Sequence, residues 1–382
     1  MTEKVPLIRL AKREDMARSR IWLIRLLAFA LALILGGLVF VIAGADPITA
    51  YSTMVAGSLG KVTGIRQVVK VAVPLLGTAL ALAPCFAMRY WNIGAEGQIT
   101  MGAMMASFFA LKMVNAMPSP VLLIVMGISA ALMGALWAGI PAFFKAHWGT
   151  NETLFTLMMN YIAIGIVGWL QGGPWEGKPG SQIIPMFDEK AVLPRVFGVH
   201  IGWIIVLILT FLMYIYMTKT KHGYEIAVLG ESENTARYAG MDVRRVMLRT
   251  ACLSGGIAGL VGFMICSGAD ETLYQTVAGG VGFTAITVTW LAQLNPFAMI
   301  AISLLLAILS KGASTIQTTM GVPASISDII TGIILLCMLG CEFFINYKMI
   351  FRGHEEHPLA PTTAQNTEVP GVSPETTKEV KA

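Results

Sequence analysis

The chain has 382 residues, 55% of them apolar and 13% charged, and its formal net charge at pH 7 is +5. Soluble domains carry about 25% charged residues, so this chain has too little polar surface to cover a globule in water. The composition excludes an ordinary soluble protein and predicts an all-α membrane protein that crosses a lipid bilayer many times. Basic residues that flank membrane spans account for the positive charge, so we expect no nucleic-acid partner.

Ten apolar segments are each close to the length that crosses a bilayer, which is about 20 residues. The predicted spans are 21–43, 67–88, 99–114, 120–142, 152–171, 201–218, 250–268, 281–294, 297–312 and 325–347. The first follows a basic stretch, as in a signal peptide, but its apolar part is too long for one, so we expect it to be retained. The sequence therefore predicts a transmembrane permease domain over 21–347, between a basic cytoplasmic N-terminus (1–20) and a disordered cytoplasmic tail (348–382).

The distribution of Lys and Arg indicates the orientation. An even number of spans places both termini on one side, and with both inside, the inside segments hold 19 of the 27 basic residues. Because cytoplasmic loops carry an excess of Lys and Arg, we predict cytoplasmic N- and C-termini in a multi-pass protein of the cell inner (plasma) membrane. The Gly- and Pro-rich loop 172–200 then faces outside.

Two predicted spans are short and follow glycine-rich loops. One comes after Trp91–Gln98, and the other after the Gly-Gly-Val-Gly run at 279–282. Interrupted spans at matching places in two halves of a chain are typical of a transporter's solute path. The segments 149–154 and 321–326, offset by 172 residues, also align, and the topology makes the two copies inverted repeats of five helices each.

The polar residues of these interrupted spans are the candidate substrate-path residues: Trp91, Asn92, Glu96, Gln98, Asn160 and Thr284. A carboxylate near the bilayer core costs roughly 2.5–3.5 kcal/mol, so it is usually paired or faces a water-filled cavity. Two interpretations of the cluster stay open. Glu96 caps its own interrupted helix or pairs with Arg89, or the Asn92 and Gln98 amides bind the solute while Trp91 stacks on it.

Catalytic and metal-binding motifs are missing from the sequence. It has no GxxxxGK[ST] phosphate loop, no GxSxG and no HExxH, and its five cysteines lie in apolar runs without metal-ligand spacing. We predict a protein that is not an enzyme, has no catalytic residues and holds no metal.

The stretch 223–250 interleaves apolar residues with charges of both signs. A free loop has no need of such apolar residues, whereas a short helix docked on another protein does. In such a helix we expect Ala236, Tyr238 and Ala239 on one side and Arg237 on another.

Several of these stretches resemble a known family. Gly223–Val243 (GYEIAVLGESENTARYAGMDV) and Ser254–Gly262 (SGGIAGLVG) are similar to ATP-binding-cassette (ABC) importer permeases of the branched-chain amino acid/ribose type. Asn92–Gln98, Gly149–Thr153 with Met159–Tyr161, and Gly282–Ile286 look like the nucleoside and simple-sugar branch, which basic-membrane-protein-type lipoproteins serve. The resemblance covers roughly 65–350, and Trp91 departs from it, since family members often carry Phe there.

This resemblance implies a ten-helix type II importer fold. It also implies a complex of two permeases, identical or different, with two ABC ATPase subunits and an extracellular solute-binding lipoprotein. ATP would be bound by the separate ATPase, leaving this chain without a cofactor. The region 219–249 would couple to the ATPase through six residues: Glu225, Ala236, Arg237, Tyr238, Ala239 and Gly240.

Two other classes of protein fit less well. An ion-coupled secondary transporter of a small polar solute would also have inverted repeats, but it needs a cluster of intramembrane carboxylates or His, and none is evident. A polytopic membrane enzyme would gather polar catalytic residues at one face, and the sequence shows no such set.

Overall fold

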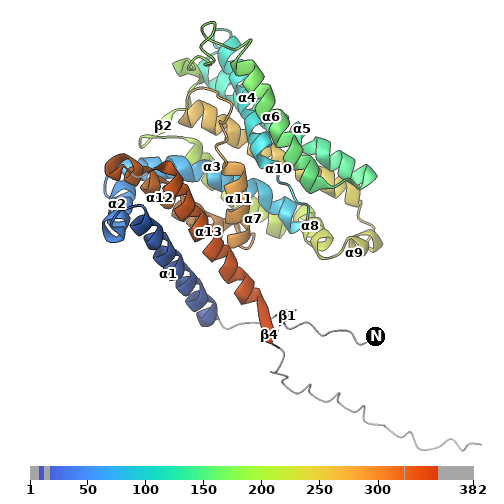
Figure 1. Cartoon of the computed structure of the whole chain (residues 1–382). Coiled ribbons are helices and arrows are strands. Elements are labelled where there is room, and N and C mark those ends of the chain that lie inside the picture. The colour runs from blue at the N-terminus through green and yellow to red at the C-terminus, as the bar shows by residue number, and fades with distance from the viewer. Residues whose placement is uncertain (1–7, 13–17, 322, 352–382) are drawn as a thin grey trace, which may run out of the picture.

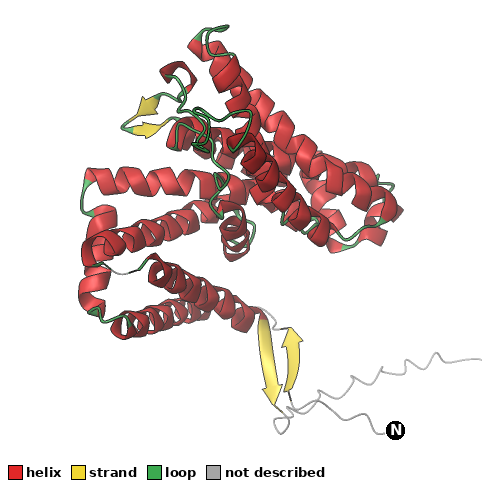
Figure 2. Ribbon diagram, turned by 45° about the horizontal axis from the view of Figure 1, so that its top comes forward, coloured by secondary structure: helices red, strands yellow, loops and turns green. Residues whose placement is uncertain are grey.

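The computed structural model describes residues 8–12, 18–321 and 323–351, and most of them are helical (Figures 1 and 2). The long helices and the shorter ones between them are α1 (Arg18–Ile42), α2 (Pro47–Leu59), α3 (Val62–Ala87), α4 (Ala95–Lys112), α5 (Ser119–Trp148), α6 (Glu152–Gln171), α7 (Gly202–Lys219), α8 (Lys221–Glu231), α9 (Glu233–Tyr238), α10 (Val243–Met264), α11 (Val281–Leu291), α12 (Pro296–Met320) and α13 (Ala324–Asn346). The remaining elements are the single turns η1 (Glu189–Ala191) and η2 (Ile265–Ala269), and the strands β1 (Ile8–Lys12), β2 (Arg195–Val196), β3 (Val199–His200) and β4 (Tyr347–Phe351).

Each of the ten predicted spans coincides with one of these helices. Among the described residues, six helices are long and apolar enough to cross a membrane, and the bent pair formed by α1 and α2 would make seven. Helix α11 is too short, because eleven residues at 1.5 Å each cover about half of a bilayer core. The structure thus confirms an all-helical protein with several spans, and the number ten stays a prediction.

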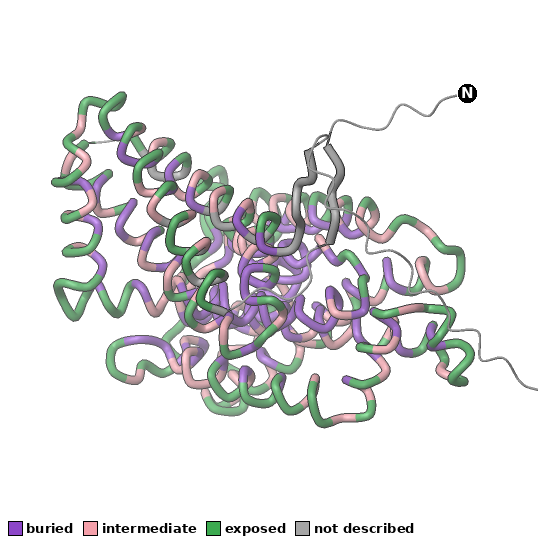
Figure 3. The backbone as a smooth tube through the Cα atoms, turned by 90° about the horizontal axis from the view of Figure 1, so that it is seen from below, coloured by how far each residue is buried: buried purple, intermediate pink, exposed green. Residues whose placement is uncertain are grey.

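Helices α3 and α10 form the centre of the bundle. Within their most apolar stretches, 83% of α3 and 78% of α10 is buried, against 22% of α7, whose apolar side chains face outward. Helix α10 packs against α4 and α5, whereas α3 packs against α11 and α12. Figure 3 shows buried residues gathered in the middle of the bundle, with exposed ones on its outer helices. The apolar outer surfaces are those that lipid would cover.

Glycine allows α10 to approach α5 closely. A Cβ added to Gly134 of α5 would lie 2.8 Å from the Gly259 Cα of α10, and one added to Gly255 would collide with the Gly134 carbonyl. Small residues at such crossings let two backbones come into contact. In lipid the hydrophobic effect does not drive helices together, so this close van der Waals packing stabilises the pair.

The first and last described segments of the chain pair as a short two-stranded ribbon. Strand β1 pairs antiparallel with β4, so that Ile8 is opposite Phe351. The sequence placed residues 348–351 in the disordered tail, and the structure places them in β4 instead. The rest of the predicted tail, 352–382, lies outside the described residues.

Helix α3 joins two distinct ends of the bundle. The β2–β3 hairpin contacts the beginning of α3, and α8 contacts its end. Figure 1 accordingly shows β2 at one end of the bundle, with α8 and α9 at the other.

Candidate functional site

The chain is interrupted between α3 and α4, where polar groups of α6 satisfy the free backbone. Helix α3 stops before Arg89, whose φ of 59° is left-handed, and α4 begins at Ala95. The Asn160 amide donates to the Ile93 carbonyl at 2.9 Å and accepts from the Gly97 N–H at 2.8 Å. Such groups must find partners within the protein, because lipid offers none. Asn160 therefore holds the break together.

Asn92 and Gln98 bond mainly to each other. Gln98 Nε2 donates to Asn92 Oδ1 at 3.0 Å, and Asn92 Nδ2 donates to Gln98 Oε1 at 3.3 Å and to Ser254 Oγ at 3.2 Å. Both side chains are buried. In this conformation the two amides brace the interrupted segment from inside, and their hydrogen bonds are satisfied within the protein.

Glu96 links the two interrupted helices. Its Oε1 accepts from the Gly280 N–H at 2.7 Å, and its Oε2 accepts from the Gly282 N–H at 2.8 Å. A carboxylate is stabilised at a helix N-terminus by the free N–H groups and the helix dipole. The sequence offered Glu96's own helix or Arg89 as its partner, and the structure shows a third one, the N-terminus of α11. A Cβ on Gly282 would lie 2.8 Å from Glu96 Cα, so only glycine fits this contact.

Three aromatic rings lie beside this junction. The Trp290 ring stacks on Trp91 and on Phe86, with centroids 5.5 Å apart in both pairs. Phe86 is buried, whereas Trp91 is 46% and Trp290 37% exposed. Thr284, also on α11, is half-buried and donates to the Gly280 carbonyl of its own helix at 3.1 Å. The exposed indoles form an aromatic surface next to the interrupted helices.

Trp290 was not among the predicted site residues. In the sequence it is a tryptophan near the end of a short, interrupted apolar segment, and nothing there shows that it meets Trp91.

The predicted coupling region consists of two short, well-capped helices. Ser232 accepts from the Thr235 N–H at the start of α9, and Asp242 caps α10 in the same way. Ala236 is buried, but Tyr238 is 93% exposed. The prediction that Ala236 and Tyr238 share one side is therefore wrong. In a helix, residues two positions apart lie on nearly opposite sides, so α9 buries Ala236 and exposes Tyr238.

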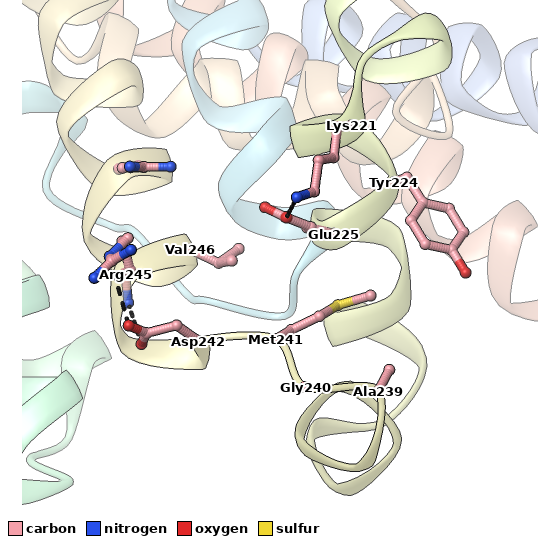
Figure 4. Close-up of a pocket in the computed structure, with 10 residues that line it drawn as sticks. Lys221, Tyr224, Glu225, Ala239, Gly240, Met241, Asp242, Arg245 and Val246 are labelled. Atoms are coloured by element: carbon pink, nitrogen blue, oxygen red, sulfur yellow. Dashed lines mark hydrogen bonds and ion pairs between the residues drawn. The ribbon is translucent and has the colours of Figure 1, made fainter.

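A pocket of about 360 Å³ opens between α8 and the start of α10 (Figure 4). It is lined by Lys221, Tyr224, Glu225, Ala239, Gly240, Met241, Asp242, Arg245, Val246 and Arg249. Ion pairs fix its walls: Lys221 lies 3.8 Å from Glu225, and Arg245 lies 3.5 Å from Asp242. Arg237 points elsewhere and pairs with Glu233 at 2.6 Å on the exposed face of α9. Of the six predicted coupling residues, the pocket brings together Glu225, Ala239 and Gly240.

The predicted coupling region touches the interrupted segment directly. Tyr90 and Met88 pack into one cluster with Ile226, Leu229 and Ala236 of α8 and α9. A Cβ added to Gly230 would collide with the Ala87 carbonyl, so α8 lies against the end of α3. Tyr90 thus packs against α8 and α9, while the next residue, Trp91, belongs to the aromatic surface.

Interrupted helices that meet inside a membrane bundle are the arrangement around which transporters pass their solutes, and this chain is a membrane transport protein of that kind. Comparison with known proteins makes the class specific. Residues 64–339 match the family described as the permease component of the branched-chain amino acid transport system, and the chain belongs to that family.

Three named relatives are similar over most of their length. The glucose ABC transporter permease protein TsgB13 of Haloferax volcanii is 32% identical over 83% of this chain and 87% of its own. The guanosine ABC transporter permease protein NupP of Bacillus subtilis is 30% identical over 86% and 95%. The nucleoside ABC transporter permease protein NupB of Lactococcus lactis is 26% identical over 87% and 93%.

Proposed function

We propose that the chain is the membrane-spanning permease subunit of an ABC importer for nucleosides or simple sugars. Its relatives are named for glucose, guanosine and nucleosides, which supports both solute classes. A separate ABC ATPase would bind the ATP, an external solute-binding lipoprotein would deliver the solute, and a second permease would complete the path. In this assignment the permease itself needs no cofactor.

The adjacency of Tyr90 and Trp91 is the observation that carries this proposal. Tyr90 is buried among the residues of α8 and α9, and Trp91 stacks on Trp290 beside the interrupted helices. A movement of α8 therefore acts on the aromatic surface through one peptide bond. An ATPase seated on α8 and α9 would have a short mechanical route to the solute path.

We assign the solute path to Trp91 and Trp290 as contacts, with Glu96, Asn92, Gln98 and Asn160 positioning them. Ring faces bind both nucleobases and the apolar faces of sugars. The amides and the carboxylate are engaged inside the protein, so their role is to fix where the two interrupted helices begin.

The packing of α3 and α10 supports ten spans in two inverted repeats. Each is the second span of its half and packs against the third and fourth spans of the other half: α3 against α11 and α12, and α10 against α4 and α5. The fourth spans, α5 and α12, also end alike, at Gly149 (φ 66°, ψ 23°) and at Gly321 (φ 66°, ψ 16°). With cytoplasmic termini, this topology would place α8 and α9 in the cytoplasm.

Tyr238 offers a test of the coupling role that does not disturb the fold. Its ring is 93% exposed, so Tyr238→Ala removes a potential ATPase contact without opening a core. In proteoliposomes that contain the full complex, we expect solute binding by the lipoprotein to persist, while uptake and lipoprotein-stimulated ATP hydrolysis both fall about tenfold. Tyr161→Ala, at an exposed position on the apolar helix α6, is the matched control and should keep both activities.

Two results would contradict the proposal. Normal uptake and normal stimulation in Tyr238→Ala would remove α9 from the coupling surface. Uptake that survives ATP depletion and stops with an uncoupler would instead indicate an ion-coupled secondary transporter.

A further inference from the structure

A second pocket lies at the end of the bundle away from α8 and α9. Its volume is about 140 Å³, well above the roughly 30 Å³ that one water takes up in the liquid. It is lined by Arg66, Gln67, Lys70, Arg195, Gly198, Val199, His200, Gly268 and Ala269. Arg66 and Lys70 lie in the first turns of α3, and His200 lies two residues before α7 begins. Both helices are membrane-length, so the pocket sits at a membrane–water boundary.

His200 is a buried polar side chain without a partner in this pocket. It is 3% exposed, and neither ring nitrogen forms a hydrogen bond with any described residue. Burial, with Lys70 and Arg195 nearby, lowers the pKa of His200 to about 4, so the ring is neutral at pH 7 and carries one N–H donor. Gly202 and Gly268 lie against the ring and leave it little room to turn. A buried donor held in one place and left unbonded costs stability, which a ligand would restore.

The charges around the pocket do not cancel. Lys70 pairs with Asp270 at 3.9 Å, and Arg195 pairs with Glu271 at 2.6 Å. Arg66 forms no ion pair with any residue the structure describes, and its guanidinium lies over Gly198, where an added Cβ would be 2.5 Å from Cζ. The pocket therefore keeps one uncompensated positive charge, beside the His200 donor.

Exposed apolar side chains precede two of the lining residues, Arg66 and Gly198, in the chain. Val62 and Ile65, on the first turns of α3, are exposed, and Phe197 at the tip of the β2–β3 hairpin is 84% exposed. These apolar side chains would not stabilise a bound inorganic ion. A molecule with both an anionic head and hydrocarbon chains would gain from all of them.

From this arrangement we propose that the pocket binds the phosphate of an anionic phospholipid headgroup, a site that does not depend on the proposed function. A phosphodiester carries one negative charge, which matches the charge left on Arg66. The Arg66 guanidinium and the His200 N–H donate to the phosphate oxygens, and the acyl chains lie along Val62 and Ile65. A zwitterionic lipid would bring its own cation close to Lys70 and Arg195, so the site favours anionic lipids.

Native mass spectrometry of the full-length protein tests this. The protein is reconstituted in nanodiscs of equal parts phosphatidylglycerol and phosphatidylcholine, and the lipids that stay bound after ejection are counted. We expect the wild type to retain phosphatidylglycerol preferentially. Arg66→Gln should lower that retention about tenfold, the loss expected from one charge-assisted hydrogen bond, and Arg66→Lys should restore part of it. Lys61→Gln, an exposed cation one turn before Arg66, should change retention less than about twofold.

Four results would overturn the proposal. One is equal retention of both lipids, and another is unchanged retention in Arg66→Gln when its melting temperature equals that of the wild type. A third is equal loss in Lys61→Gln, which would indicate diffuse surface charge. The fourth is binding of inorganic phosphate to lipid-free protein with no preference among lipids, which would make the ligand a free ion. His200→Gln, which keeps an N–H donor, should retain phosphatidylglycerol better than His200→Leu, and the reverse order would remove His200 from the site.

Discussion

The indole rings of Trp91 and Trp290 stack with their centroids 5.5 Å apart and their planes at 25°, although they come from opposite halves of the chain. Trp91 precedes α4 and Trp290 lies in the last turn of α11, so the stack ties together the two interrupted helices. Both rings remain partly exposed, and they form the main aromatic surface of the proposed solute path.

Replacing Trp290 should weaken solute recognition. Stacking of a base on an aromatic ring contributes about 1–3 kcal/mol, so Trp290→Ala should raise the KM for uptake about tenfold or more, and Trp290→Phe should restore most of it. Concentration-dependent uptake of labelled guanosine and glucose would measure the effect for each solute. Trp169→Ala, exposed on α6, should leave KM unchanged. A wild-type KM in Trp290→Ala would show that solute does not contact this ring.

Neutralising Glu96 should loosen the junction of the two interrupted helices. Glu96→Gln keeps the shape but loses the charge that two backbone N–H groups of α11 bind, at a cost of about 1.5–3 kcal/mol. We expect a lower melting temperature in nanodiscs and uptake reduced about tenfold or more, with membrane insertion intact. Glu189→Gln, exposed in η1, serves as the control. Uptake and melting at wild-type values would argue against the junction as a functional element.

A single methyl group at the α5–α10 crossing should be strongly destabilising. In Gly255→Ala the new Cβ meets the Gly134 carbonyl, and overpacking of this kind costs about 1–3 kcal/mol or more. Gly165→Ala adds the same methyl to α6 where no atom lies within 4 Å, so it should be neutral or slightly stabilising. Thermal unfolding of the two variants in the same detergent compares them directly. Equal melting temperatures would mean that the crossing is looser than the structure shows.

His200 should make the protein sensitive to mild acid. Its pKa in the folded protein is about 4, below the usual 6.5, because the ring is buried near Lys70 and Arg195. The unfolded state therefore binds the proton more readily, and stability is lost as the pH falls from 6.5 towards 4, by about 3 kcal/mol in total. Melting temperatures of wild type and His200→Gln should diverge from a common slope over this range. Parallel curves would contradict the low pKa.

The topology can be tested by cysteine labelling of intact cells. With cytoplasmic termini, Ser181→Cys in the loop 172–200 should react with a membrane-impermeant maleimide, whereas Ser232→Cys between α8 and α9 should react only after permeabilisation. The native cysteines are buried or half-buried, so the unsubstituted protein sets the background. The opposite labelling pattern would invert the membrane orientation.

Most of the fold was predictable because a helix that crosses lipid needs a run of about 20 mainly apolar residues, which is visible in the sequence. Apolar runs of span length located every long helix. Helix α6 begins after Asn151, a residue type common at helix N-termini, whose side chain accepts from the Leu154 N–H at 3.1 Å. The true lengths were less predictable. Helix α12 continues to Met320, well past the predicted end at 312, because the hydroxyls of Thr315, Thr318 and Thr319 donate to carbonyls of their own helix and allow a polar continuation.

The site was only half predictable. Glu96, Asn92 and Gln98 stood out as polar residues in an apolar stretch, and the structure brings them together. The partners of Glu96 did not stand out, because they are the backbone N–H groups of Gly280 and Gly282, which side-chain chemistry does not reveal. Tyr238 shows the opposite error: its spacing from Ala236 was interpreted as a shared face, and only the docking of α9 decided which residue is exposed.

The single peptide bond between Tyr90 and Trp91 has a thermodynamic consequence under the proposed function. If ATPase binding at α8 and α9 changes the affinity of the aromatic surface for solute, then solute must change the affinity of the ATPase for α8 and α9 by the same factor. The coupling would therefore act in both directions through this bond, and the permease with solute bound would have a different affinity for its ATPase from the permease without solute.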